Sequence, residues 1–364
     1  MEDRRTFLKT VAAVGVSFSI MPGCVNMQPI RAKVPMKTQK TEKALVLWYS
    51  QTGYTKRNGK LLAKTMEKNG IKVTSSEIRN FDRKGINNFD LIVIGSPVFY
   101  YDTPEFVKNW ISSLPNLKGI PVASYVTFGG PEGNQHNAAC SILERLAEKE
   151  GVPIGINSFM NMASYPLAWS EEQVAEKTWM NRHLPNEETY EKVRQYARQL
   201  INRVELGKRA EFSKKLTLRE ISTYLGPIWW TKQMVKNHAI LKDNCIECGT
   251  CVEKCPVDAI NLSNYTIDKE SCVLCFGCIN NCPAQAVNME YKGEKVIGYN
   301  EFMKRYHLKI VEPEELIGCG SFGHLSQRGT VSALFSGTAY WAHPDVPART
   351  HGQTDHRGRK NGSF

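Results

Sequence analysis

The chain has 364 residues, of which 41% are hydrophobic, and a formal net charge of +11 at pH 7. This length suffices for two domains with further segments, and the apolar fraction is that of an ordinary globular protein. Residues 1–43 carry a net charge of +5 and residues 319–364 carry +3, so the 275 residues between them carry only +3. Because the basic charge lies at the two ends, the composition argues against a nucleic-acid-binding groove in the body of the chain.

The N-terminal segment, residues 1–43, combines two adjacent arginines with a short apolar run and a polar linker. Arg4 and Arg5 precede the apolar run at residues 11–20, which is too short for a membrane span of about 20 residues. The segment resembles a twin-arginine export signal, the route for proteins that fold before they cross the membrane. This resemblance implies a location outside the cytoplasm, in the periplasm or associated with the membrane through the N-terminus. Lipidation of Cys24 is a second means of membrane association.

From residue 44 the sequence alternates short apolar stretches with amphipathic ones. The apolar stretches predict five parallel strands, at residues 44–50, 71–78, 89–98, 120–130 and 152–162. Helical patterns lie between and after them, at residues 55–70, 104–114, 137–151 and 186–207. The alternation predicts an α/β domain over residues 44–206 with a doubly wound parallel sheet. Residues 163–185 are an insertion that covers a ligand or lies on the surface.

Two loops of this domain carry residues that suit a ligand. The stretch SQTGYT, residues 50–55, offers hydroxyls and a glycine at the start of a helix, where free amides and the helix dipole favour an anion. The loop after the third strand carries adjacent aromatic residues that suit a flat heterocycle. In a sheet of order 2-1-3-4-5 these two loops lie where the winding reverses, which is where ligands bind.

This combination resembles a flavodoxin, and the resemblance implies an FMN site. Tyr54 stands where flavodoxins commonly have a small polar residue. The alternative is a flavodoxin-like fold that has lost its cofactor. For the phosphate the resemblance implies Ser50, Thr52, Gly53, Tyr54 and Thr55. For the ring it implies Ser96, Pro97, Val98, Phe99 and Tyr100, and for a third loop Thr127, Phe128, Gly129 and Gly130.

Residues 207–237 form an inter-domain linker that contains a run of apolar side chains. We expect these side chains to dock the following domain against the first, and the alternative is a surface for a partner or a quinone. The apolar residues are Leu216, Leu218, Ile221, Tyr224, Leu225, Ile228, Trp229 and Trp230.

Eight of the eleven cysteines lie within residues 245–282. They form two copies of C-x2-C-x2-C-x3-C-P, offset by 27 residues, which indicates an internal duplication. Three cysteines of one copy reach three corners of a cubane cluster, and the fourth ligand comes from the other copy. We therefore assign two 4Fe-4S clusters, one to Cys245, Cys248, Cys251 and Cys282, the other to Cys272, Cys275, Cys278 and Cys255. A pair of zinc sites and a disulfide knot are the alternatives, although zinc motifs generally pair C-x2-C with a distant second pair.

Residues 238–292 are similar to the small α+β two-cluster ferredoxins of bacteria, and the two domains together resemble flavodoxin-fused ferredoxins. That resemblance implies electron transfer between redox protein partners through FMN and two clusters. The alternative is an FMN-dependent oxidoreductase that reduces a quinone or another small molecule. We find no G-x-G-x-x-G fingerprint, which argues against direct oxidation of NAD(P)H. Clusters are built in the cytoplasm, so a cluster protein that is exported needs a route for folded chains.

Residues 293–364 form a C-terminal extension. From residue 319 they show no periodicity and are rich in Gly, Ser and His, so we expect this part to be disordered. A metal-binding tail is the alternative.

Overall fold

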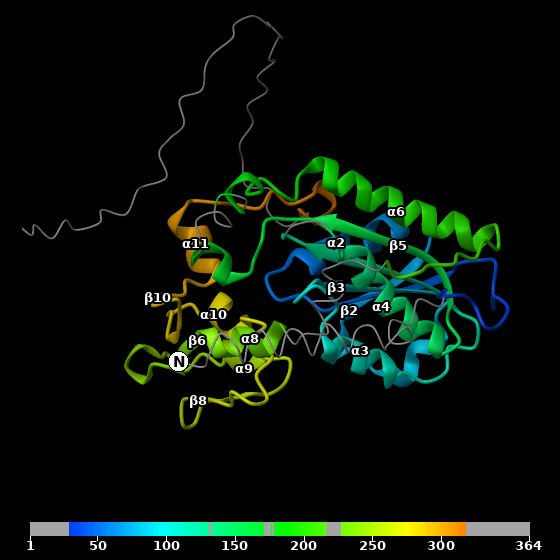
Figure 1. Ribbon diagram of the computed structural model, residues 1–364. Coiled ribbons are helices and arrows are strands. Elements are labelled where there is room, and N and C mark those ends of the chain that lie inside the picture. The colour runs from blue at the N-terminus through cyan, green and yellow to red at the C-terminus, as the bar shows by residue number, and fades with distance from the viewer. Residues whose placement is uncertain (1–28, 131–132, 171–175, 177, 216–226, 318–364) are drawn as a thin grey trace, which may run out of the picture. The chain divides into compact units, whose positions relative to one another are not determined.

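The computed structural model describes residues 29–130, 133–170, 176, 178–215 and 227–317 (Figure 1). Residues 1–28 of the twin-arginine segment and the tail from residue 319 lie outside the described residues, and so does most of the apolar run of the linker. Among the residues that are described, no helix is both long and apolar enough to cross a membrane.

The first half of the chain builds a five-stranded parallel sheet of order β2-β1-β3-β4-β5. This confirms the predicted doubly wound, flavodoxin-like sheet. The inner strands β1, β3 and β4 are buried along almost their whole length, which explains why their sequences are continuously apolar rather than alternating. The strands are β1 (Lys43–Trp48), β2 (Lys72–Glu77), β3 (Leu91–Pro97), β4 (Pro121–Phe128) and β5 (Val152–Met160).

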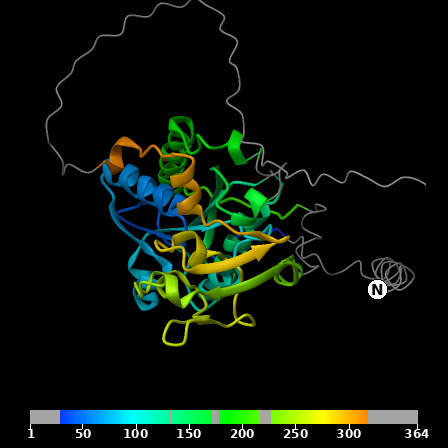
Figure 2. The ribbon, with the colours of Figure 1, turned by 90° about the vertical axis from the view of Figure 1, so that its left-hand side faces the viewer.

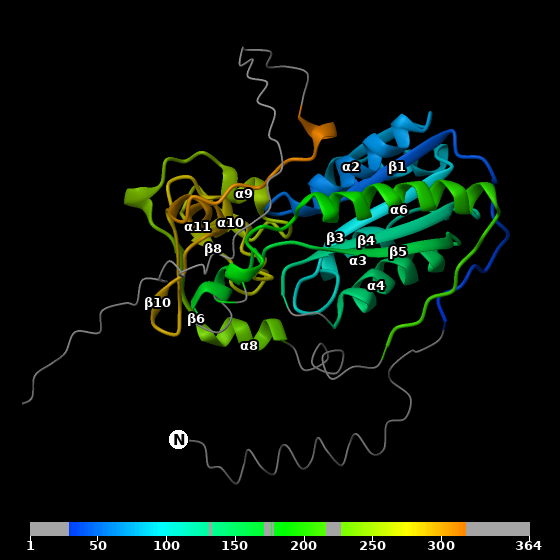
Figure 3. The same ribbon diagram turned by 90° about the horizontal axis from the view of Figure 1, so that it is seen from above.

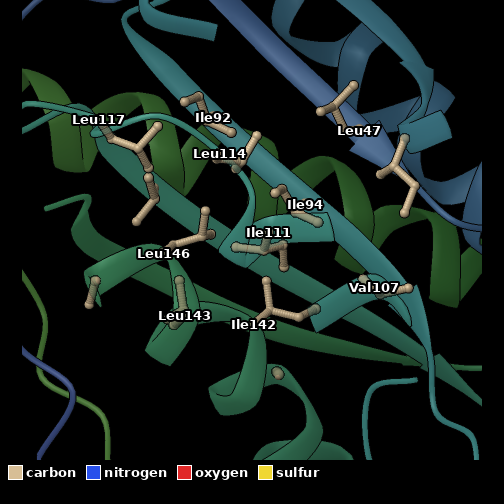
Figure 4. Close-up of a cluster of buried hydrophobic side chains, with 14 of the residues drawn as sticks. Leu47, Ile92, Ile94, Val107, Ile111, Leu114, Leu117, Ile142, Leu143 and Leu146 are labelled. Carbon is tan, nitrogen blue, oxygen red and sulfur yellow. The ribbon is translucent and has the colours of Figure 1, made fainter. Parts of the chain in front are cut away.

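Four helices cover the two faces of this sheet (Figure 3). One core cluster joins α3 and α4 to side chains such as Leu47 and Ile94 (Figure 4). The second joins α2 and α6 to the alternate residues of the same strands, such as Val46 and Val93. The two clusters take alternate residues of each strand because successive side chains of a strand point to opposite faces of the sheet. The helices are α2 (Tyr54–Lys68), α3 (Glu105–Ser112), α4 (Gln135–Glu148) and α6 (Glu187–Glu205), with 3-10 turns η1 (Ile78–Asn80), η2 (Arg83–Asn88) and η3 (Pro166–Ser170).

The second half is a small α+β unit with two antiparallel sheets, of order β10-β9-β6 and β7-β8 (Figure 2). Its internal duplication is visible in the backbone, because the two short helices α9 and α10 are also offset by 27 residues. Each follows a residue in the left-handed conformation, Gly249 or Phe276. The elements are α8 (Pro227–Met234), β6 (Val235–Ile240), η4 (Lys242–Asn244), α9 (Thr250–Lys254), β7 (Ile260–Asn261), β8 (Thr266–Ile267), α10 (Gly277–Asn281), β9 (Val287–Tyr291) and β10 (Glu294–Lys295).

The part of the linker that the structure describes includes the two tryptophans that were expected to dock the two halves. Trp229 and Trp230 are 56% and 57% exposed, so the expectation that they dock the two halves is wrong. The insertion is one of the segments that contact the second half: Leu167 packs into the core of that half, and Trp169 stacks on Phe302 at 4.0 Å between ring centroids.

The chain after residue 293 folds back onto the first half. It contains α11 (Tyr299–Arg305) and the turn η5 (Glu314–Leu316). Glu312 forms a two-bond ion pair with Arg57 of α2, and Glu315 forms one with Arg194 of α6. These contacts tie the C-terminal segment to both helices on that face of the sheet.

The Arg194–Glu315 pair predicts an acid-sensitive contribution to stability. Hydrogen bonds from Arg194 lower the pKa of Glu315 to about 2, below the ordinary value of about 4.3. Because the folded-state pKa is depressed, the stabilisation is complete above the ordinary pKa and is lost as the pH falls through about 2. We expect Glu315→Gln to lower the free energy of unfolding at pH 7, by an amount that shrinks between about pH 4 and pH 2. Urea unfolding at pH 7 and at about pH 2 measures this loss of stability, and Glu314→Gln, at an exposed residue, is the control. Equal stability of the wild type and Glu315→Gln at pH 7 would contradict the prediction.

Candidate functional site

The eight clustered cysteines line two separate cavities, four to each. The grouping crosses the two sequence copies, because each cavity takes three cysteines of one copy and the fourth of the other. The eight clustered cysteines are free thiols. Within the part of the chain that the structure describes, no three His, Cys, Asp or Glu side chains are placed to hold a single metal ion. We call Cys245, Cys248, Cys251 and Cys282 the distal set, and Cys255, Cys272, Cys275 and Cys278 the proximal set.

Backbone amides donate to the cysteine sulfurs in a pattern that repeats between the two sets. The amides of Glu247 and Leu274 each lie 3.4 Å from the sulfur two residues before them, in Cys245 and Cys272. The amides of Ala259 and Ala286 each lie 3.2 Å from the sulfur four residues before them. Such bonds stabilise negative charge on sulfur, which is the charge of a thiolate that binds a cluster.

The two cysteine sets differ in their exposure to solvent. In the proximal set Cys255 and Cys278 are buried, whereas Cys248 of the distal set is exposed. Burial raises the pKa of the Cys275 thiol to about 12 and the pKa of Cys278 well above its ordinary value. A hydrogen bond with Thr250 lowers the pKa of Cys248. The distal set is therefore the more accessible of the two to a molecule in solution.

One buried histidine lies against the proximal set. His238 of β6 is 6% exposed and lines the same cavity as the proximal cysteines. Its Nε2 atom lies 3.7 Å from Sγ of Cys278. Burial lowers the pKa of His238 to about 4, so the ring is neutral at pH 7 and carries one N–H.

The loop 50–55 connects β1 to α2 and forms an open helix N-terminus. Gly53 occupies the N-cap position with φ of 97°, and no side chain caps the helix. The first turn of α2 carries no acidic residue. The Ser50 hydroxyl is buried and has no hydrogen-bond partner. Unpaired first-turn amides and a free hydroxyl are what an anion needs at such a terminus.

Tyr54 and Thr55, the last two residues of this loop, have hydrogen-bond partners. Tyr54 is buried, and its hydroxyl lies 2.6 Å from the hydroxyl of Tyr299 in α11. Thr55 is buried, and its Oγ1 lies 2.8 Å from Oγ1 of Thr127. The structure thus brings the first and third predicted loops together through Thr55 and Thr127. Tyr54, the departure from the usual flavodoxin sequence, anchors the loop to the C-terminal segment.

The predicted ring loop, residues 96–100, runs from the end of β3 toward the proximal cysteines. The Ser96 hydroxyl donates to the carbonyl of Pro97, and the Val98 amide donates to the carbonyl of Thr127. Phe99 packs edge-on against Tyr49, with 6.3 Å between ring centroids. The Tyr100 hydroxyl donates to the carbonyl of Leu274, between two proximal cysteines, at 3.1 Å.

The third predicted loop, residues 127–130, continues from β4 beside the insertion. Phe128 accepts a backbone hydrogen bond from Asn161. A side chain at Gly129 would meet the Ala163 backbone at 2.4 Å, whereas nothing lies within 4 Å of one at Gly130. Gly129 is therefore required for close packing, and Gly130 faces open space.

Gln51, which the sequence analysis passed over, joins the loop 50–55 to the proximal cysteines. Its side-chain amide donates to the carbonyl of Cys275, and its Oε1 accepts from Nδ2 of Asn280 at 2.9 Å. Its carbonyl accepts from Nδ2 of Asn281 at 3.3 Å. We call these contacts the Gln51 clamp. Gln51 and Asn280 are 7% and 1% exposed, so the clamp is shielded from water.

Comparisons with known proteins found separate similarities for the two halves. A family model described as a 4Fe-4S binding domain matches residues 238–261, whereas curated proteins gave no match. A solved flavodoxin from the domain Archaea is 15% identical, with a TM-score of 0.34, over 45% of this chain and 99% of that flavodoxin. Oxidised flavodoxin 2 from Bacillus cereus is 18% identical, with a TM-score of 0.34, over 43% of this chain and 97% of that protein. The order of the strands in the five-stranded sheet shows a flavodoxin-like fold. The chain therefore joins this fold to a 4Fe-4S binding domain.

Proposed function

We propose that this protein is an iron–sulfur flavoprotein that transfers electrons between redox partners, with two 4Fe-4S clusters and FMN as its cofactors. The observation that carries the proposal is the Gln51 clamp. It places a set of four cysteines directly against a loop that is suited to a phosphate. When bound, the clusters supply one-electron chemistry and FMN supplies one- or two-electron chemistry.

The cysteine residues fit two clusters. Each cavity offers four thiols and two backbone amides that donate to sulfur. Four thiolates are the ligand set of a 4Fe-4S cluster, and the apolar walls, such as Ile240 and Met289, keep water away. The distal and proximal sets would each hold one cluster.

The loop residues fit the phosphate of FMN. The buried Ser50 hydroxyl without a partner supports this, because such a group costs free energy unless a ligand pairs with it. Ser50, Thr52 and the amides that follow Gly53 would hold the phosphate. The loops at residues 96–100 and 127–130 would flank the ring.

The partners and the location of the protein are part of the same proposal. The exposed Cys248 favours exchange at the distal set with a second redox protein, because solvent access lets a partner approach. The twin-arginine resemblance of residues 1–43 supports export of the folded, cofactor-loaded chain. A test mixes the anaerobically reduced protein with oxidised ferredoxin or with a quinone in a stopped-flow instrument. Rapid oxidation of the reduced protein by ferredoxin supports an electron carrier. Turnover with the quinone alone contradicts it.

A substitution in the phosphate loop tests the FMN site. We expect Ser50→Ala to weaken FMN binding by roughly 10- to 150-fold, because a hydrogen bond to a charged group contributes about 1.5–3 kcal/mol. Isothermal titration of the flavin-stripped protein with FMN measures the dissociation constant. Ser113→Ala, at the exposed end of α3, is the matched control and should leave the constant unchanged. Equal affinities of the wild type and Ser50→Ala would contradict the site.

A further inference from the structure

The proximal set has a side-chain neighbour that the cysteine pattern does not predict. His238 lies on β6, which pairs with β9, and it lines the same cavity as Met289 and the proximal cysteines. The Nε2 atom lies 3.7 Å from Sγ of Cys278, and both residues are buried. A thiolate that binds a cluster has no proton, so it can only accept a hydrogen bond. In a hydrogen bond between such a sulfur and a ring nitrogen, the ring nitrogen therefore carries the proton.

We propose that His238 donates its Nε2–H to Sγ of Cys278 and thereby raises the reduction potential of the proximal cluster. This inference rests on the proposed function, since it requires a cluster at the proximal set. A hydrogen bond to a ligand sulfur stabilises negative charge, and the cluster gains one negative charge when it is reduced. The reduced form therefore gains more from the bond than the oxidised form does. His238 is a positioning and tuning residue, not a ligand.

The internal duplication offers a built-in comparison. The position equivalent to His238, 27 residues later, is Tyr265, whose hydroxyl donates to the carboxylate of Glu247 and not to a cysteine. The four backbone N–H···S contacts occur in equal pairs at both sets. The distal set has a side-chain contact of its own, between Thr250 and Cys248 at 3.3 Å, but Cys248 is exposed. A buried donor has the larger electrostatic effect because water screens it less.

EPR-monitored potentiometric titration of the cluster-loaded protein tests the inference. We expect His238→Phe to shift one of the two cluster midpoints to a more negative potential and to leave the other in place. His238→Gln keeps an N–H donor and should restore part of the shift. Tyr265→Phe, the matched control from the other half, should leave both midpoints at their wild-type values. Wild-type midpoints in a fully loaded His238→Phe protein would overturn the inference.

A second measurement needs no substitution. In wild-type protein labelled with 15N-histidine and then reduced, pulsed EPR should detect a histidine nitrogen coupled to a cluster. A spectrum without that coupling would overturn the inference even if His238→Phe does not load its clusters. Iron analysis distinguishes a failure of the inference about His238 from a failure of the proposed function. Wild-type protein without about eight iron atoms per chain contradicts both, whereas eight irons with unchanged midpoints contradict only the role of His238.

Discussion

Replacing Cys255 and Cys272 together by alanine should remove one cluster only, so that the variant keeps about four of eight iron atoms. These two cysteines belong to different sequence copies but line the same cavity. Once the first substitution has destroyed that site, the second has nothing further to remove. The effects of residues that act on one site are not additive.

The opposite result is expected for Cys245→Ala combined with Cys255→Ala. These cysteines belong to the same sequence copy but line different cavities, so the variant should lose nearly all of its iron. Iron and sulfide analysis of anaerobically purified proteins measures both variants, and Cys140→Ala, a buried cysteine outside the motifs, controls for general damage. If each copy instead held a cluster with its own four cysteines, the two double variants would exchange their results.

Asn280→Leu should lower the free energy of unfolding by about 3–5 kcal/mol. Nδ2 of Asn280 donates to Gln51 and to the carbonyl of Ser164, and its Oδ1 accepts from the Tyr299 amide at 2.9 Å. Leucine fills a similar volume but leaves three polar groups unpaired, those of buried Gln51 and Tyr299 and of half-buried Ser164, at a cost of about 1–3 kcal/mol for each buried group. Because Gln51 lies in the phosphate loop, FMN binding should weaken as well.

Urea unfolding and FMN titration of the same preparation measure the two effects of Asn280→Leu. The equivalent position in the other copy is Glu253, which is exposed and whose side chain pairs with its neighbour Lys254. Glu253→Leu is the matched control, and its stability should lie within about 0.5 kcal/mol of the wild type. A loss of stability in Asn280→Leu as small as in this control would show that the clamp contributes little to the fold.

The sheet was predictable from the sequence because its signals are local. Strands that are buried on both faces appear as continuous apolar runs, and turns and helix ends separate them. The grouping of the cysteines followed from the spacing of C-x2-C-x2-C-x3-C, because a chain that short cannot reach all four corners of a cubane. In each case the signal lies in the spacing of residues within one strand or one cysteine motif.

The contacts between the two halves were not predictable in the same way. Gln51 and Asn280 are 229 positions apart, and nothing in either local sequence indicates that they meet. His238 is a lone histidine on a strand, which more often packs in a core than tunes a site. Trp229 and Trp230 misled the prediction because exposed aromatic residues have the same sequence pattern as docking residues. Pairing over such distances is decided by the packing of complete domains.

Quantitative analysis of protein purified without oxygen tests the central claim most directly. If two cysteine sites lie beside a flavin site in one folded unit, each chain should contain about eight iron atoms, about eight sulfides and one FMN. Two zinc ions per chain, or disulfides at the eight cysteines with no bound flavin, would contradict that claim.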